Sequence, residues 1–312
     1  MKQRIGAVIA AAGQNTEFEP LQTLGTITLA ERTIATLRHA GIVQIAVVTG
    51  YKADELEHQL ARYDVMFFRN LNYARSEMID SYRIGISYLL DKCDRILLSP
   101  CDIPFFTAKT IRSMLEEEGD YIRPAYNGRP GHPIILSSRL ASRIIDYRSE
   151  GGLAGAFAEY GIQPVTVDVD DSGILLEYAD VYKNTEMLQQ HSRSMIRPLL
   201  NVSFAKEKVF FDSRIALLLS LVGDLGSVSK ACKTMQISYT KGWNLIRDIE
   251  LQTQCELIKR NVGGLSGSSS ELTERGKQLL ESFRQFESIM QEHAEEEFRR
   301  IIPDWCQSDS KE

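Results

Sequence analysis

Short apolar runs alternate with amphipathic segments over about the first two hundred residues. The runs have the length and apolar content of buried strands, and the amphipathic segments repeat their apolar positions at helical spacing. Strands are expected at Gly6–Ala10, Gln44–Thr49, Val65–Phe68, Arg95–Ser99 and Pro133–Leu136, and helices at Leu29–Ala40, Ala53–Arg62, Ser81–Leu90 and Ala108–Glu117. This order predicts an α/β fold whose mostly parallel sheet is covered by helices on both faces.

The pattern becomes mainly helical from Phe211 onward. Helices are expected at Asp212–Val222, Ser227–Met235, Ser238–Leu251 and Thr273–Ile301, and strands at Glu256–Arg260 and Glu271–Thr273 on either side of a Gly/Ser-rich stretch. We therefore place a domain boundary near residues 192–202. The expected organisation is a first domain at 1–192, a second at 203–301 and a polar tail at 302–312.

Composition places the chain among globular proteins. Of its 312 residues, 43% are hydrophobic and 25% are charged, which excludes wholesale disorder and fibrous architectures. No apolar run approaches the roughly 18 residues of a membrane span, and no signal-peptide pattern is evident. We expect a cytoplasmic protein without a membrane partner. The five cysteines are scattered and odd in number, which favours buried thiols over disulfides or a zinc site.

The net charge of −6 hides a segregation along the chain. Residues 1–200 hold 21 Lys and Arg against 25 Asp and Glu, residues 201–270 hold 9 against 6, and residues 271–312 hold 6 against 11. Only the middle segment is basic. A basic island within an acidic chain suits a small nucleic-acid-binding module when a matching motif accompanies it.

Motifs in the first domain follow one another in a recognisable order. They are Ala10-Ala-Ala-Gly13, Leu24-Gly25, Gly41-Ile-Val-Gln-Ile-Ala-Val-Val-Thr-Gly50-Tyr51, Asn70-Leu-Asn-Tyr73, Ser99-Pro-Cys-Asp102-Ile-Pro104 and Gly128-Arg-Pro-Gly-His-Pro133. Over about residues 4–190 the chain resembles the MobA-like nucleotidyltransferases of molybdenum cofactor synthesis, especially the cytidylyltransferase branch. The resemblance implies a Rossmann-like nucleotidyltransferase sheet.

The resemblance also implies positions for a nucleotide, a pterin phosphate and Mg²⁺. The nucleotide would be held by Ala11, Ala12, Gly13 and Gln22, and the metal by Asp102 and Asp180. Gly131 and His132 match the family's substrate-side loop, which would face a molybdopterin-type small molecule. Two alternatives stay open: Asp102 can instead cap the following helix, and His132 can serve only as a hydrogen-bonded loop residue.

Three positions depart from the family pattern: two of them lose a positive charge, and the third adds a negative one. Glu17 stands where the family has Arg, and Glu19 where Gly is usual. The family's Lys is replaced by Gln22 or, in a shifted alignment, by Leu21. We expect two lost cations to cost on the order of 10³-fold or more in the rate of nucleotidyl transfer, because anionic reactants must meet at this site. We expect a retained pocket with weakened or lost catalysis, unless the cations of Lys52, Arg69, Arg75 or Arg129 compensate.

The basic segment carries helix-turn-helix signals. Ser227 and Ser238 are expected caps of two successive helices. Val228, Ala231 and Cys232 would form the inward face of the first helix, and Trp243, Ile246 and Ile249 that of the second. A Gly/Ser-rich hairpin then follows, as in a winged helix.

The same segment, about residues 202–285, resembles the winged-helix domain of ModE-type molybdate-responsive regulators. The resemblance is carried by Gly226-Ser-Val-Ser-Lys-Ala231, by Ser238-Tyr with Trp243, and by Glu271-Leu-Thr-Glu with Gly276. It implies contacts with double-stranded DNA. The candidate DNA-binding residues are Ser238, Tyr239, Lys241, Asn244, Arg247, Lys259 and Arg260.

The last predicted helix has a broad apolar stripe that includes Leu280, Phe283, Phe286 and Ile289. Two interpretations stay open: the stripe forms a homodimer, as in the resembled regulators, or it packs on its own domain. The sequence ends without a regulator-type molybdate-binding domain, so we expect any sensor in the first domain. The first hypothesis is a dimeric transcription regulator with a nucleotidyltransferase-like sensor. The alternative is an active Mg²⁺-dependent transferase of CTP or GTP with a fused regulatory domain.

Overall fold

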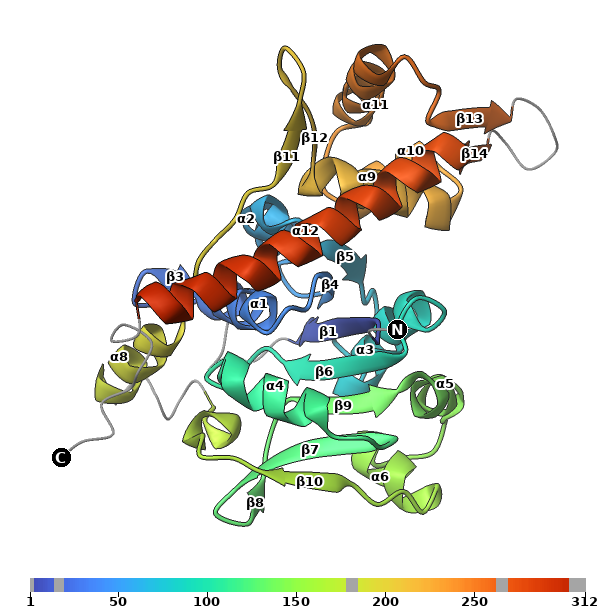
Figure 1. Ribbon diagram of the computed structural model, residues 1–312. Helices are drawn as coiled ribbons and strands as arrows, with labels where there is room; N and C mark the ends of the chain where they lie inside the picture. The colour runs from blue at the N-terminus through green and yellow to red at the C-terminus, as the bar shows by residue number, and fades with distance from the viewer. Residues whose placement is uncertain (1–2, 14–19, 178–184, 262–268, 303–312) are drawn as a thin grey trace. The chain divides into compact units, whose positions relative to one another are not determined.

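The computed structural model describes residues 3–13, 20–177, 185–261 and 269–302. They form two compact units, which divide the chain between Ile196 and Arg197 (Figure 1). The first unit is built on one sheet in the order β10-β7-β9-β6-β1-β4-β5, with β8 paired to β7. Its strands are β1 (Ile5–Ala11), β4 (Gln44–Thr49), β5 (Met66–Arg69), β6 (Arg95–Pro100), β7 (Tyr121–Tyr126), β8 (Arg129–Pro130), β9 (Ile134–Ser137) and β10 (Val165–Asp168).

Parallel pairing dominates this sheet. Strand β1 pairs in parallel with both β4 and β6, β4 with β5, and β7 with β10, whereas β9 runs antiparallel between β6 and β7. The prediction of a mostly parallel α/β fold is therefore confirmed. The central strands are almost completely buried, as the continuous apolar runs require.

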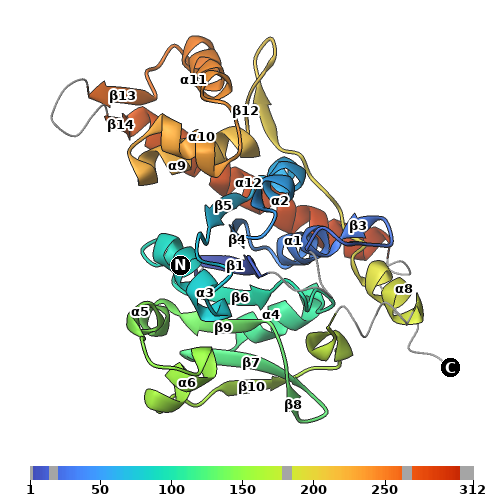
Figure 2. The same ribbon diagram turned by 180° about the vertical axis from the view of Figure 1, so that it is seen from behind.

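Helices cover both faces of the sheet (Figures 1 and 2). One face carries α1 (Leu29–His39), α2 (Ala53–Leu60) and α4 (Ala108–Glu116), whose apolar residues share a core cluster with Ile9, Val47 and Leu97. The other face carries α3 (Met78–Leu89), which contacts α5 (Ser138–Asp146) and α6 (Gly152–Glu159). A Cβ at Gly85 of α3 would lie 2.4 Å from Val8, so this helix needs glycine where it crosses β1.

Smaller elements complete the first unit. They are the hairpin β2 (Thr23–Leu24) and β3 (Ile27–Thr28), the 3-10 turns η1 (Ala61–Tyr63) and η2 (Ser172–Leu175), and α8 (Thr185–Ser194). A buried arginine links α8 to α1: Nη1 of Arg32 lies 3.0 Å from Nδ1 of His191, and its Nη2 donates to the carbonyl of Leu24. Burial lowers the pKa of His191 to about 4. The imidazole is therefore neutral, and Nδ1 accepts from Arg32 while Nε2 donates to the carbonyl of Phe106.

The carboxylate of Asp171 fastens the end of the β10 segment to the start of α4. It accepts from the backbone amide of Thr107 at 2.8 Å, from the hydroxyls of Thr107 and Thr110, and from the amide of Gly173 at 3.0 Å. Asp171 is buried and Asp170 beside it is exposed. Asp171 therefore has a structural role, since it ties the segment after β10 to the first turn of α4.

The second unit consists of helices and two short hairpins. Its elements are β11 (Ser203–Ala205), β12 (Val209–Asp212), α9 (Ser213–Leu225), α10 (Val228–Thr234), α11 (Tyr239–Thr253), β13 (Ile258–Asn261), β14 (Ser269–Leu272) and α12 (Glu274–Ile301). All four of these helices begin with a side-chain cap that accepts from a backbone amide in the first turn. The caps are Asp212, Ser227, Ser238 and Thr273, which include both predicted serines.

Two close contacts fix the packing of the second unit. Phe283 of α12 is fully buried, with its ring centroid 5.0 Å from that of Phe211 and 5.2 Å from that of Phe204. A Cβ at Gly242 of α11 would lie 2.3 Å from Sγ of Cys232 in α10, so only glycine allows the two helices to approach this closely. No helix among the described residues is long and apolar enough to cross a membrane.

We predict that Asp171→Ala lowers the free energy of unfolding by about 2–4 kcal/mol, because four donors at the start of α4 and in the η2 turn lose their buried acceptor. Urea denaturation followed by circular dichroism measures the change. Asp170→Ala is the matched control and should shift stability by less than about 0.5 kcal/mol. Equal effects of the two substitutions would contradict the assigned role of Asp171.

Candidate functional site

The carboxyl ends of three neighbouring parallel strands meet at one edge of the sheet. Ala12 follows β1, Gly50 follows β4 and Asp102 lies just beyond β6. The amide of Tyr51 donates to the carbonyl of Ala12 at 3.1 Å, which joins the first two loops. A Cβ at Gly50 would lie 2.6 Å from that carbonyl oxygen, so glycine is required for this contact. Ligands of open α/β sheets bind at such an edge.

The predicted nucleotide loop begins at this edge. Ala11 and Ala12 are buried, and Gly13 is exposed. A Cβ at Gly13 would meet no heavy atom within 4 Å, so the surface is open there. Glu17 and Glu19, the two acidic departures from the family pattern, lie outside the described residues.

The amino end of α1 does not add its amides to this loop. The amide of Leu29 donates to the carbonyl of Gln22 and that of Ala30 to the carbonyl of Pro20, both at 3.2 Å. Thr28 and Glu31 complete a capping box. The first-turn amides of α1 are thus satisfied within the chain. Any phosphate held by this loop would depend on loop amides and side chains, and Gln22 brings no charge to it.

Asp102 is the most conspicuous carboxylate at the edge. Burial raises its pKa above the ordinary range for aspartate, because the ionised form loses hydration. Its Oδ1 is buried and has no hydrogen-bond partner among the described residues. The alternative interpretation as a helix cap is not supported, since Thr107 caps α4. A buried carboxylate oxygen without a donor fits a hard cation such as Mg²⁺.

Tyr82, which the sequence analysis did not select, lies in the same electrostatic environment. Its side chain on α3 is 1% exposed, and its hydroxyl has no hydrogen-bond partner among the described residues. Burial, together with the charge of Asp102, raises the pKa of Tyr82. A tyrosine on the buried face of a helix looks like core in a sequence, so only the fold reveals that its hydroxyl interacts with the aspartate.

The loop with Gly131 and His132 lies between β8 and β9. The amide of Gly131 donates to the carbonyl of Pro124 at 3.0 Å, and that of His132 to the carbonyl of Ile174 at 2.9 Å. A Cβ at Gly131 would lie 2.5 Å from the oxygen of Ile174. Burial lowers the pKa of His132, so its imidazole is neutral at neutral pH, and its Nδ1 lacks a partner among the described residues. A neutral imidazole of this kind can exchange a hydrogen bond with a ligand.

The second predicted metal ligand, Asp180, lies outside the described residues. Within residues 3–13, 20–177, 185–261 and 269–302, no three His, Cys, Asp or Glu side chains gather as a metal site. Of the two predicted metal ligands, the structure therefore describes Asp102 alone.

Arg69, one of the four basic residues expected to compensate for the missing cations, is already bound to carboxylates of its own unit. Its Nε and Nη2 donate to the buried carboxylate of Glu57 at 2.8 and 2.6 Å, and Nη2 also pairs with Asp54. These carboxylates raise the pKa of Arg69 further. The ammonium of Lys52 lies 5.5 Å from the centroid of the Tyr51 ring.

Arg75 and Arg129 remain exposed. Arg129 lines a hollow of about 300 Å³ together with Tyr126, Asn127, Ser172, Leu175 and Leu176. Arg129 therefore places a cation beside a hollow that is large enough to receive part of a small molecule.

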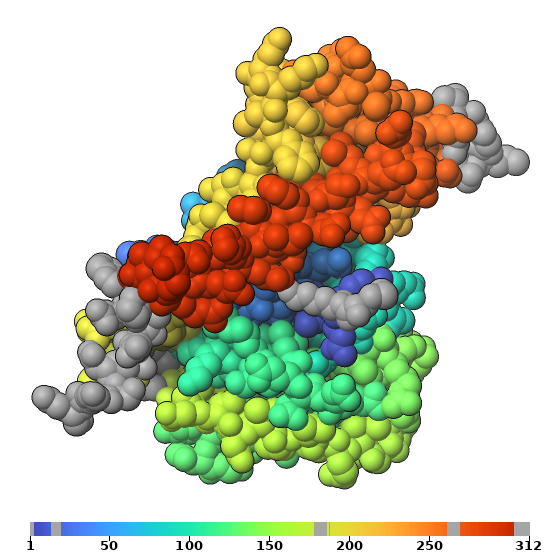
Figure 3. Space-filling view, viewed as in Figure 1, coloured from blue at the N-terminus to red at the C-terminus, as the bar shows by residue number. Residues whose placement is uncertain are grey.

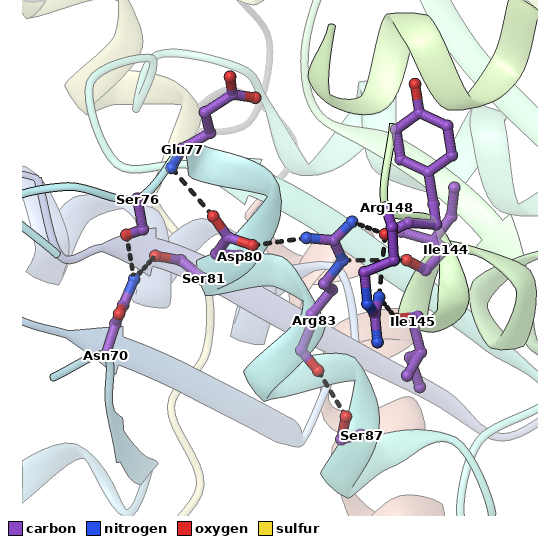
Figure 4. Close-up of polar contacts among 11 residues, drawn as sticks. Asn70, Ser76, Glu77, Asp80, Ser81, Arg83, Ser87, Ile144, Ile145 and Arg148 are labelled. Atoms are coloured by element: carbon purple, nitrogen blue, oxygen red, sulfur yellow. Dashed lines mark hydrogen bonds and ion pairs between the residues drawn. The ribbon is translucent and has the colours of Figure 1, made fainter. Parts of the chain in front are cut away.

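Helix α3 holds the loop after β5 in place (Figure 4). Nδ2 of Asn70 donates to the hydroxyls of Ser76 and Ser81 at 2.8 and 3.1 Å. Arg83 pairs with Asp80 and donates to the carbonyl of Ile144 at the end of α5. These bonds anchor the helix that carries Tyr82.

In the second unit, α11 presents an exposed polar face. Lys241, Asn244 and Arg247 recur at helical spacing on this face, while Gly242, Ile246 and Ile249 are buried on the other. No ion pair involves Lys241 or Arg247 within the described part of the chain. Tyr239 is 54% exposed, whereas the hydroxyl of Ser238 is used in capping α11.

Trp243 is not the core residue that its spacing predicts. It is half-buried, because Gly242 occupies the contact with α10 and turns the indole toward β13. Arg260 covers the indole, with the guanidinium carbon 3.5 Å from the ring centroid. Beside this pair is a hollow of about 470 Å³, lined by Trp243, Arg247, Glu250, Glu256, Ile258, Lys259 and Arg260.

The apolar stripe of α12 is divided. Leu280 and Phe283 are buried, so the first part packs on its own unit. Phe286 and Ile289 remain 46% and 55% exposed, on a helix whose outer surface is visible in Figure 3. Own-unit packing therefore accounts for part of the stripe, and a homodimer stays a prediction.

We predict that Asp102→Asn raises the free energy of unfolding of the metal-free protein at neutral pH. Because burial raises the pKa of Asp102, its ionisation costs stability in full above the raised pKa, and the cost disappears once the pH falls below about 4, where the carboxyl is protonated in both the folded and the unfolded state. Urea denaturation over a pH series measures this difference. The exposed Asp91→Asn is the control and should show no such trend. A destabilised Asp102→Asn at neutral pH would contradict the geometry.

Two curated relatives illustrate what the chain is similar to. The DNA-binding transcriptional dual regulator ModE of Escherichia coli is 30% identical over 86 residues, which cover 28% of this chain and 33% of that protein. The molybdenum cofactor cytidylyltransferase of Escherichia coli is 29% identical over 96 residues, which cover 30% of this chain and 48% of that protein. The chain thus spans a third to a half of the length of these curated relatives.

A solved nucleotidyl transferase from Methanothermobacter shares the fold of the first unit, with a TM-score of 0.52 and 24% identity over 60% of this chain and 98% of that one. Residues 7–165, just over half of the chain, match the family model of the MobA-like NTP transferase domain. That match covers most of β1, the strands β4, β5 and β6, and the sheet edge with Gly50 and Asp102. The chain belongs to the MobA-like NTP transferase family.

Proposed function

We propose that this protein is a DNA-binding transcription regulator linked to molybdenum cofactor metabolism, in which the nucleotidyltransferase-like unit binds a nucleotide or a molybdopterin-type metabolite. The proposed regulator is a homodimer in the cytoplasm. The second unit would act as a winged helix, with α11 as the recognition helix in the major groove and the β13–β14 hairpin as the wing.

The exposed cationic face of α11 carries this proposal. Lys241, Asn244 and Arg247 lie on one side of a helix whose opposite side is packed against α10 through Gly242. Lys259 lies nearby, on a strand that lines the same hollow as Arg247. Such donors, unpaired within the described residues, can bind phosphates and base edges. The relatives named as ModE regulators support the same assignment.

The first unit is proposed to bind rather than to react efficiently. Gln22 replaces a family cation, α1 directs its first amides to its own chain, and Arg69 is engaged by Glu57 and Asp54. An anionic nucleotide would therefore meet less countercharge than in the family pattern. Ligand affinity can survive such a loss better than catalysis, because the transition state of phosphoryl transfer depends more strongly on preorganised cations.

The second candidate function is an active Mg²⁺-dependent nucleotidyltransferase of CTP or GTP, and the geometry of Asp102 favours it. The buried Oδ1 without a donor would hold Mg²⁺ at the sheet edge, with Asp180 as a proposed second ligand. When bound, Mg²⁺ would neutralise phosphate charge. His132, neutral and partly unpaired, would orient the acceptor from the β8–β9 loop.

We predict that the full chain binds a labelled duplex taken from immediately upstream of its own coding sequence. Replacing both Lys241 and Arg247 by Ala should weaken binding and lower the slope of log K against log salt by about 1.8, because each lost phosphate contact removes about 0.9. Fluorescence anisotropy over a salt series measures both. Lys277→Ala with Arg299→Ala on α12 removes the same charge and serves as the control. Unchanged binding by the Lys241/Arg247 variant would refute the assignment of α11.

We predict that purified protein with Mg²⁺, CTP or GTP and a molybdopterin acceptor releases pyrophosphate at a rate on the order of 10³-fold below that of an enzyme with both loop cations. A coupled pyrophosphate assay measures it. Asp102→Ala and the exposed, remote Asp91→Ala form the comparison. Fast turnover that is lost in Asp102→Ala and kept in Asp91→Ala would contradict the sensor proposal and support the active nucleotidyltransferase.

A further inference from the structure

The β13–β14 hairpin is braced against α11 at two points. At its base, Oε1 of Glu250 accepts from the amides of Leu257 at 2.9 Å and Ile258 at 3.2 Å. Further along β13, the guanidinium of Arg260 lies over the indole of Trp243, well within the roughly 6 Å range of a cation–π contact. Two separated contacts between a strand and a helix fix the direction of the strand as well as its position.

The indole is itself held by its neighbours on α11. The ring of Tyr239, one turn earlier, meets it edge-on with centroids 6.2 Å apart. The indole Nε1 is buried and has no acceptor among the described residues. The contact with Arg260 therefore depends on the ring face and not on a hydrogen bond from the indole.

The cations around the same hollow differ in what they already contact. Lys259 and Arg247 are exposed and have no ion pair or ring contact within the described part of the chain. Arg260 is exposed at its edge, but its flat face is covered by Trp243. Ile258, two residues before Arg260 and so on the same face of β13, is buried.

We propose that Arg260 is a positioning residue that sets the angle between wing and recognition helix by stacking on Trp243, while Arg247 and Lys259 at the adjoining hollow take the backbone phosphate of DNA. This division of roles rests on the proposed DNA-binding function. Under this proposal Lys259 and Arg260 have different roles, although they are neighbouring basic residues of β13 and look equivalent in the sequence. Lys can replace Arg in a cation–π contact, whereas Gln cannot.

The stacking is tested first without DNA. In the full chain carrying Trp305→Phe, Trp243 is the single tryptophan, and acrylamide quenching of its fluorescence reports its exposure. Arg260→Gln should increase quenching, Arg260→Lys should largely retain the wild-type value, and Lys259→Gln should leave it unchanged. Circular dichroism confirms that the variants keep equal helicity. Quenching that is the same in Arg260→Gln and wild type overturns the inference.

The role in binding is then measured from the salt dependence of duplex affinity, with the upstream duplex as the probe. Lys259→Gln and Arg247→Gln should each lower the slope by about 0.9, as expected for a lost phosphate contact. Arg260→Gln should weaken binding about two- to fivefold with an unchanged slope, and Arg260→Lys should restore most of the affinity. A slope lowered by Arg260→Gln as much as by Lys259→Gln overturns the positioning role while the DNA-binding function stands. If the wild-type chain does not bind the duplex, the proposed DNA-binding function is wrong, and so is the positioning role of Arg260.

Discussion

Parallel pairing of β1 with both β4 and β6 is the constraint on which the first unit depends. Because the three strands run in the same direction, the loops that follow them must meet at one edge. The approach of Gly50 to the carbonyl of Ala12 closes this edge, and no larger residue fits there. Everything proposed for the unit, from the open surface at Gly13 to the buried carboxylate of Asp102, follows from that arrangement.

The charges at this edge of the sheet bear on whether the first unit binds a ligand only or also catalyses a reaction. Asp102 has a raised pKa and an oxygen without a partner among the described residues, so we expect its ionisation to cost stability unless a cation or a hydrogen-bond donor of a ligand pairs with it. The nearby positive charge is limited: Gln22 is neutral, and Arg69 is paired with two carboxylates. These charges support the proposed binding role, in which Asp102 would hold a metal ion while few cations among the described residues face the phosphates.

The second unit uses close packing to expose charge. Gly242 lets α11 lie against Cys232 of α10. With this side of α11 buried, Lys241, Asn244 and Arg247 lie on its exposed side. Trp243 is directed sideways to the wing, where it meets Arg260. In both units, a glycine that permits a close backbone or helix approach decides where the polar side chains point.

The sequence by itself determined the fold class, because buried parallel strands and amphipathic helices leave strong periodic signals: β4 was predicted with its observed ends, and α4 to within one residue. It did not indicate β7, β10, α5 or the β11–β12 hairpin, whose short or interrupted apolar patterns become strands and helices only through tertiary pairing. The candidate residues Asp102 and His132 followed from motifs. The structural role of Asp171, the orphaned hydroxyl of Tyr82 and the stacking of Arg260 on Trp243 required the tertiary structure, because each depends on partners distant in sequence. Local pattern specifies which face of an element is buried, and only the packed chain specifies what that face meets.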